Sequence, residues 1–118
     1  MLIRHLALTV RDPGRSADFY LSAVGLYGRA KVEAWGIRLD LDDGFLLALI
    51  RGERSPVSAR DAVHFGCTLP GPGQAREIRE RMHTLGVREI EWEDSDGYVG
   101  VKVADPDGYV VELFYEFI

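Results

Sequence analysis

Several features that would by themselves define a class of function are scarce or missing in this sequence. Its single cysteine, Cys67, can form neither an internal disulfide nor a cluster of thiolate metal ligands. Its apolar runs are shorter than the ~18 residues that a transmembrane helix needs, so we expect no membrane span. The first residues lack the basic region, apolar stretch and cleavage site of a signal peptide, which indicates a cytoplasmic protein.

Positive charge is scarce too. The chain has 14 Lys and Arg residues against 19 Asp and Glu, and the net charge of −5 argues against nucleic acid or an anionic membrane as a partner. With 118 residues and 47% hydrophobic content, the chain is large enough for one compact domain with its own core. We therefore expect a single globular domain.

The sequence does contain an internal repeat. The stretch HLALTV that starts at His5 matches HFGCTL from His64, and residues 36–48 match residues 100–112. Such self-similarity predicts two modules of the same fold. We expect module one over residues 1–50, a linker over residues 51–61 and module two over residues 62–118.

Each module reads as strand, helix, strand, strand, strand, which predicts an α+β protein made of two βαβββ units. The expected strands cover residues 2–10, 29–34, 37–41, 45–50, 62–69, 87–92, 97–104 and 109–117. In module one, Asp12 is a suitable N-cap, Pro13 suits the first helical position, and Gly25 suits the end of the helix. In module two, Gly86 ends a helix whose apolar positions are Ala75, Ile78, Met82 and Leu85.

Strand alternation places the candidate metal ligands. His5 and Ala7 share one face of their strand, as His64 and Gly66 do in theirs, while Glu112 has apolar neighbours on both sides. A buried carboxylate needs a cation or hydrogen-bond donors, and two imidazoles with one carboxylate form a facial metal-binding set. A single strand histidine is more often packed or exposed, and Glu112 could instead pair with Lys102 or Arg38. The joint pattern favours a metal site.

Particular stretches of the sequence resemble the vicinal-oxygen-chelate superfamily, also described as the glyoxalase/bleomycin resistance protein/dioxygenase family. The matching stretches are residues 5–12 (HLALTVRD), 16–20 (SADFY), 25–26 (GL), 64–66 (HFG) and 105–114 (DPDGYVVELF). The resemblance implies two βαβββ modules that form a cupped mixed sheet around a divalent metal. His5, His64 and Glu112 fall where members of the family place metal ligands.

The departures from the family pattern indicate which groups within the family this chain resembles less. Glyoxalase I and the epimerases of this family carry a fourth ligand in the first module, and the repeat places Ala48 there. A three-ligand site is closer to the thiol transferases and extradiol dioxygenases. The cationic and hydroxyl groups expected around fosfomycin are replaced here by Ala7, Ala48, Ile50 and Glu91, which argues against that substrate. His83 is expected on a helix surface, in solvent.

The resemblance implies a small divalent-metal enzyme that chelates a substrate through two neighbouring oxygens, as a lyase, an isomerase or a ring-cleaving dioxygenase. The alternative is a non-catalytic drug- or metabolite-binding protein of the bleomycin-resistance type. Fe, Mn, Ni, Co and Zn all suit the ligand set. The residues expected to line the pocket are mostly apolar, which favours a hydrophobic or aromatic substrate body. They are Ala7, Leu46, Ala48, Ile50, Val110 and Phe114.

Two cations occupy equivalent positions in the repeat. Arg38 and Lys102 could bind an anionic substrate group. Lys102 could also transfer protons in a catalytic role, while Glu112 holds the metal. Alternatively, the Arg38 and Lys102 side chains both extend into solvent. The resemblance also implies a domain-swapped homodimer, for which the linker is long enough. In that arrangement His5 of one chain would join His64 and Glu112 of the other.

Overall fold

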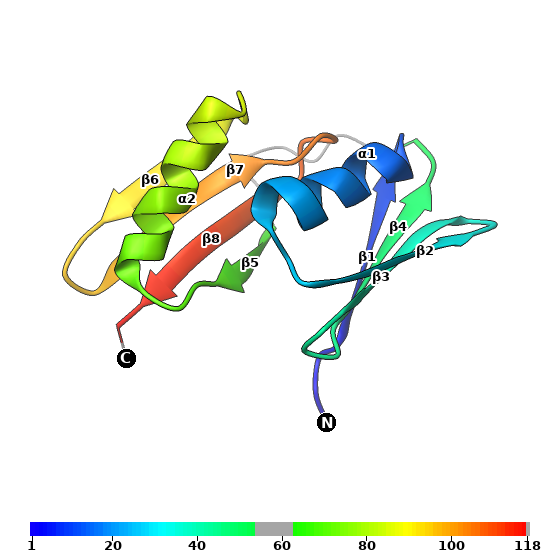
Figure 1. The fold of residues 1–118 in the computed structure, drawn as a ribbon, viewed down its shortest axis with the longest axis horizontal. Helices are drawn as coiled ribbons and strands as arrows, with labels where there is room; N and C mark the ends of the chain where they lie inside the picture. The colour runs from blue at the N-terminus through cyan, green and yellow to red at the C-terminus, as the bar shows by residue number, and fades with distance from the viewer. Residues whose placement is uncertain (54–62, 118) are drawn as a thin grey trace. The chain divides into compact units, whose positions relative to one another are not determined.

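The computed structural model describes residues 1–53 and 63–117 (Figure 1). The chain divides into two compact units, Met1–Ser55 and Pro56–Ile118, which are described separately below. None of the described helices has the length and apolar character that crossing a lipid bilayer requires. Most of the linker predicted over residues 51–61 lies outside the described residues, and Arg51 is the last residue of a strand.

The first unit is a four-stranded sheet with a helical segment. Its elements are β1 (His5–Val10), α1 (Pro13–Asp18), η1 (Phe19–Val24), β2 (Gly28–Glu33), β3 (Gly36–Leu41) and β4 (Leu46–Arg51). The strand order is β1-β4-β3-β2, with β1 parallel to β4 and the other neighbours antiparallel.

The second unit repeats this topology. Its elements are β5 (His64–Thr68), α2 (Pro72–Thr84), β6 (Glu89–Asp94), β7 (Tyr98–Ala104) and β8 (Val110–Glu116). The order is β5-β8-β7-β6, and β5 is parallel to β8. The predicted α+β fold of two βαβββ modules is confirmed.

The first helical segment begins as predicted and then departs from regular α-helical geometry. The Asp12 side chain accepts a hydrogen bond of 3.1 Å from the Arg15 backbone N–H, and Pro13 occupies the first turn. From Phe19 onwards the segment is a π-helix, which ends at Gly25 with a φ of +87°. The wider turn of a π-helix buries Phe19 together with Tyr20, whereas an α-helical spacing did not predict Phe19 as a core residue.

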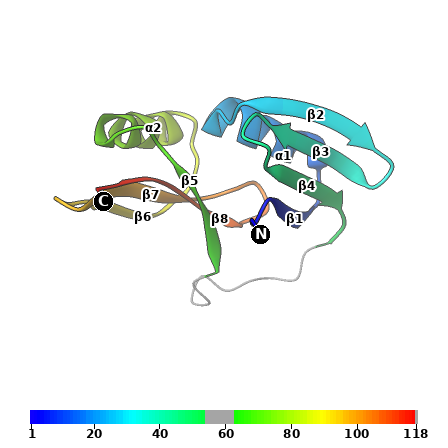
Figure 2. The same ribbon diagram turned by 90° about the horizontal axis from the view of Figure 1, so that it is seen from below.

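Each helical segment covers one face of its own sheet. In the first unit α1 contacts β3 and β4, and in the second α2 contacts β7 and β8 (Figure 2). The large buried side chains alternate along the strands, because every second residue points toward the helix. They include Leu8, Val10, Leu39, Leu47 and Leu49 in the first unit and Val99, Val101, Val103, Val111 and Leu113 in the second. We call the other face of each sheet its open face.

Replacing Leu113 by Ala should destabilise the protein strongly, because this residue is 0% exposed on β8, which packs against α2. Leaving a cavity of this size in a packed core costs about 3 kcal/mol of unfolding free energy. Urea denaturation measures this loss. The matched control is Leu2→Ala, where the side chain is 73% exposed and the expected change is within about 0.5 kcal/mol. Equal losses for the two variants would contradict the assigned core.

Candidate functional site

The open face of the second unit brings two of the predicted site residues into one row across the sheet. The register pairs Gly66 of β5 with Glu112 of β8, Glu112 with Lys102 of β7, and Lys102 with Glu91 of β6. Residues paired in this way point to the same face. The sheet therefore places Glu112 between a glycine and a lysine, on the side away from α2.

Glu112 and His64 lie side by side on this face. His64 Nε2 is 3.5 Å from Glu112 Oε2, and their side chains are 30% and 19% exposed. The two residues come from adjacent parallel strands, because β5 is hydrogen-bonded to β8. An imidazole nitrogen and a carboxylate oxygen at this separation are two donors that can bind one divalent cation.

Tyr98 is a third member of this cluster, and the sequence analysis missed it. Its hydroxyl donates a short hydrogen bond to Glu112 Oε1. Its ring stacks on Phe114, with ring centroids 5.8 Å apart and planes 16° from parallel. Burial, and then the hydrogen bond to Glu112, raises the pKa of the Tyr98 hydroxyl above its usual value.

Two glycines make room for this cluster. A Cβ on Gly100 would lie 2.3 Å from the Tyr98 hydroxyl oxygen, and one on Gly66 would lie 2.8 Å from Phe114 Cε1 and 3.4 Å from Glu112 Oε2. Both positions are inside strands, where glycine is otherwise unfavourable. A glycine inside a predicted strand is therefore the sequence signal that could have revealed this cluster. It indicates that a neighbouring side chain lies over the glycine position.

Lys102 does not pair with Glu112. Its Nζ lies 3.3 Å from Glu91 Oε2 on the neighbouring strand, and its side chain is 25% exposed. Arg38 belongs to the first unit, where its Nε donates to Asp40 Oδ1 at 2.8 Å. Glu112 is thus paired with an imidazole and a phenol, rather than with a lysine or arginine side chain.

The first unit shows the same register with different side chains. His5 starts β1 and pairs with Leu46, as His64 starts β5 and pairs with Val110. Ala7, Ala48 and Arg38 then form the row that corresponds to Gly66, Glu112 and Lys102. Ala48 is therefore the structural counterpart of Glu112. Leu46 and Ile50 share its face of β4, as Phe114 shares the face of Glu112 on β8.

The predicted ligands are thus divided between the two units. His64 and Glu112 lie together in the second unit, and His5 lies in the first. Over residues 1–53 and 63–117, no three His, Cys, Asp or Glu side chains gather in a metal-binding group.

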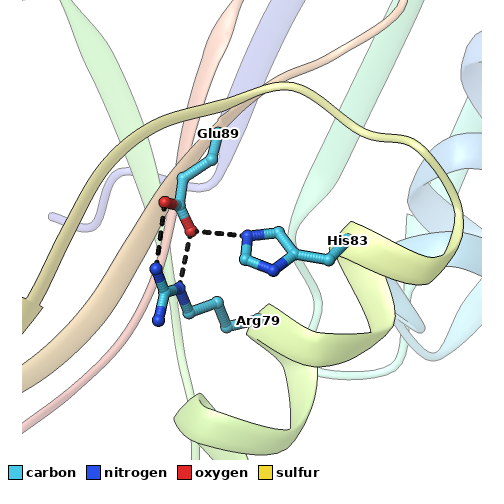
Figure 3. Close-up of polar contacts among 3 residues, drawn as sticks. All are labelled: Arg79, His83 and Glu89. Atoms are coloured by element: carbon cyan, nitrogen blue, oxygen red, sulfur yellow. Dashed lines mark hydrogen bonds and ion pairs between the residues drawn. The ribbon is translucent and has the colours of Figure 1, made fainter.

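A second polar cluster lies on the opposite side of the sheet, against α2 (Figure 3). Glu89 accepts hydrogen bonds from Arg79 Nε at 2.7 Å and Nη2 at 3.2 Å, and its Oε1 is 3.0 Å from His83 Nε2. His83, expected in solvent, is 49% exposed and is part of this cluster. Arg79 also lies over the ring of Trp92, 4.5 Å from its centroid.

A β-bulge explains why Glu89 faces the helix while Glu91 does not. The pairing of β6 with β7 shifts register between these two residues, so that Glu89 pairs with Val103 and Glu91 with Lys102. The strand predicted over residues 87–92 is observed as β6, which extends to Asp94, and Asp94 pairs with Arg76 of α2. These ion pairs fasten α2 to the edge strand.

Comparison with known proteins gives a consistent picture. A sequence model of the glyoxalase/bleomycin resistance protein/dioxygenase superfamily matches residues 2–113. No curated protein matches the sequence significantly.

Many solved structures share the fold. A possible glyoxalase from Bacillus cereus has a TM-score of 0.79 and 23% identity, over 96% of this chain and 97% of that one. A lactoylglutathione lyase from Agrobacterium tumefaciens has a TM-score of 0.74 and 19% identity, over 97% and 92%. The fosfomycin resistance protein FosX from Listeria monocytogenes has a TM-score of 0.77 and 17% identity, over 100% and 95%. At these identities the likeness concerns the fold.

Removing the Glu89 carboxylate should destabilise the protein at neutral pH. The hydrogen bonds from Arg79 are the main cause that lowers the pKa of the Glu89 carboxyl, and the contact with His83 adds to this effect. A carboxyl group whose pKa is lower in the folded state than in the unfolded state stabilises the fold. The stabilisation is fully present above the unfolded-state pKa of about 4.3, and it is lost as the pH falls through the lower, folded-state pKa.

Glu89→Gln should therefore lower the thermal midpoint by a few degrees at pH 7, and the difference from the wild type should shrink below about pH 4. Thermal unfolding followed by circular dichroism across this range measures it. Glu80→Gln, on the exposed side of α2, is the control and should behave like the wild type. A difference for Glu89→Gln that persists unchanged at low pH would contradict the ion-pair assignment.

Proposed function

Because this chain belongs to the glyoxalase/bleomycin resistance protein/dioxygenase superfamily, we propose that it is a small enzyme that uses a divalent metal to chelate a substrate through two neighbouring oxygens. Members of this superfamily commonly use divalent metals and generally bind small-molecule substrates. The reaction belongs to the lyase, isomerase or ring-cleaving dioxygenase types found in this superfamily.

The observation that supports the metal most directly is the pairing of His64 with Glu112. Glu112 is largely buried on a sheet face, and a desolvated carboxylate is stabilised by a cation next to it. The nearby lysine in its row pairs with Glu91 instead. An imidazole nitrogen 3.5 Å from a carboxylate oxygen fits the donor chemistry of Fe, Mn, Ni, Co or Zn.

His5 is proposed as the third ligand. It occupies the same position in β1 that His64 occupies in β5, and both strands are paired in parallel with the last strand of their own unit. Ala48, at the counterpart position of Glu112, has no donor atom. A site with three protein ligands leaves positions open for the two substrate oxygens.

When bound, such a metal supplies Lewis-acid stabilisation of negative charge that develops on substrate oxygens. The chain's own residues bind and orient the rest of the substrate. Phe114 and Val110 provide an apolar surface on either side of Glu112 along β8, and Ile50 and Leu46 do so on either side of Ala48. Lys102 is placed to bind an anionic group or hold a proton, since it shares the row of Glu112 and is three-quarters buried.

The metal can be tested on protein purified without a polyhistidine tag. After reconstitution with Mn, Fe, Co, Ni or Zn, elemental analysis should find bound divalent metal, and His64→Ala and Glu112→Ala should each weaken binding by at least about 100-fold. His83→Ala is the matched control, because His83 contacts Glu89 on the opposite face of the sheet. A wild-type protein that binds none of these metals would overturn the proposal and favour a non-catalytic binding protein.

We further propose that the protein is a homodimer in which His5 of one chain joins His64 and Glu112 of the other. His5→Ala and Glu112→Ala chains, each defective alone, should then restore metal binding when they are unfolded and refolded together. Random pairing in a twofold dimer restores about a quarter of the wild-type sites. Metal content of the mixture measures this fraction. Sites built within one chain would show no restoration, and light scattering gives the oligomeric state independently.

A further inference from the structure

We propose that Tyr98 is a positioning residue that holds Glu112 Oε1 and thereby reserves Oε2, the oxygen beside His64, for the metal. This inference rests on the proposed metal site and adds a residue to it. It follows from the different surroundings of the two carboxylate oxygens. Oε1 accepts the hydrogen bond of the Tyr98 hydroxyl, and Oε2 lies 3.5 Å from His64 Nε2.

The hydrogen bond has a fixed direction. A tyrosine hydroxyl is protonated at neutral pH, because its usual pKa is about 10, whereas an ionised carboxylate can only accept. Tyr98 therefore donates and Glu112 accepts. Without such a donor, rotation about the last side-chain bond of Glu112 would exchange its two oxygens freely.

The Tyr98 ring is itself held in place. Tyr98, Gly100 and Lys102 point to the same face of β7 at intervals of two residues, and Glu112 is paired with Lys102. The ring therefore runs along the strand and crosses Gly100 to reach Glu112. Stacking on Phe114 supports one side of the ring. The absent side chain of Gly100 leaves room for the hydroxyl, since a Cβ there would approach it to 2.3 Å.

The repeat provides a second argument. The offset of 64 residues that relates Gly36 to Gly100 and Ala48 to Glu112 also relates Ala34 to Tyr98. The module without the carboxylate thus lacks the phenol as well, whereas the glycine is present in both. The phenol and the carboxylate therefore occur together in module two and are both missing from module one, as expected if Tyr98 acts through Glu112.

The consequence for the metal is a defined mode of ligation. A carboxylate with one oxygen engaged by a phenol would favour binding a cation through the other oxygen, whereas a carboxylate without such a donor can bind equally well through both. Ligation through one oxygen keeps one more coordination position open for the substrate. Tyr98 therefore acts on the substrate-binding capacity of the site without itself contacting the metal.

The test is Tyr98→Phe, which removes the hydroxyl and keeps the ring that stacks on Phe114. Binding of Co(II) followed by calorimetry and by the visible d–d absorption reports both affinity and coordination. We expect Tyr98→Phe to bind Co(II) about 10- to 100-fold more weakly, the usual effect of losing a partner of a metal ligand, with a changed d–d spectrum. The thermal midpoint of the metal-free protein should fall by only a few degrees, because the buried carboxylate loses one hydrogen-bond donor while the ring packing is kept.

Two controls separate positioning from general perturbation. Tyr27→Phe removes the hydroxyl of a tyrosine that is 81% exposed and should leave affinity and spectrum unchanged. Gly100→Ala should reproduce the effect of Tyr98→Phe by displacing the ring, while Gly97→Ala, whose Cβ would meet nothing within 4 Å, should not.

The outcomes distinguish this inference from the proposed function. A wild-type protein that binds Co(II), with a Tyr98→Phe variant of the same affinity and the same d–d spectrum, overturns the role of Tyr98 and leaves the metal site standing. If the wild-type protein binds neither Co(II) nor Zn, Mn, Fe or Ni, the proposed metal site is rejected. The positioning role of Tyr98 is then rejected with it.

Discussion

In each unit a helical segment covers one face of a four-stranded sheet, and this one-sided coverage determines where chemistry can occur. Strand side chains alternate between faces, so every residue that packs under the helix has neighbours that point to the open face. Val111 and Leu113 are fully buried under α2, and this fixes Glu112, between them, on the opposite side. The apolar core thus sets the direction of the Glu112 carboxylate.

A largely buried carboxylate needs hydrogen-bond donors or a cation to offset the loss of its hydration. Around Glu112 the neighbouring groups are a phenol hydroxyl and an imidazole rather than a lysine or arginine. Tyr98 donates to one oxygen and His64 lies beside the other, while Lys102 is engaged by Glu91. A permanent Lys102–Glu112 ion pair would neutralise the carboxylate and compete with a bound metal. The bulge in β6 contributes to this division, because it turns Glu91 toward the lysine and Glu89 toward the helix.

Much of this arrangement could be predicted from the sequence, because it depends on local rules. Alternation placed His64 and Glu112 on the open faces of their strands, and Asp12 and Gly86 marked helix ends through backbone chemistry that they bring with them. The partners of the charged groups could not be predicted in the same way. The contact of Tyr98 with Glu112 depends on the register of β7 against β8, and that of His83 with Glu89 depends on a one-residue bulge. A shift of one residue in either place would move these side chains to the other face.

The difference between the two units has an electrostatic consequence for the proposed site. Two neutral imidazoles and one carboxylate leave a divalent ion with a net charge of about +1, whereas a second carboxylate at position 48 would leave it close to neutral. Under the proposed function, Ala48 would therefore leave a bound metal a stronger Lewis acid toward an anionic chelating substrate, and with one protein ligand fewer. A site with fewer ligands is less rigidly defined by the metal itself. The orientation of Glu112 then depends more on the protein, and the hydroxyl of Tyr98 is the group placed to supply that orientation.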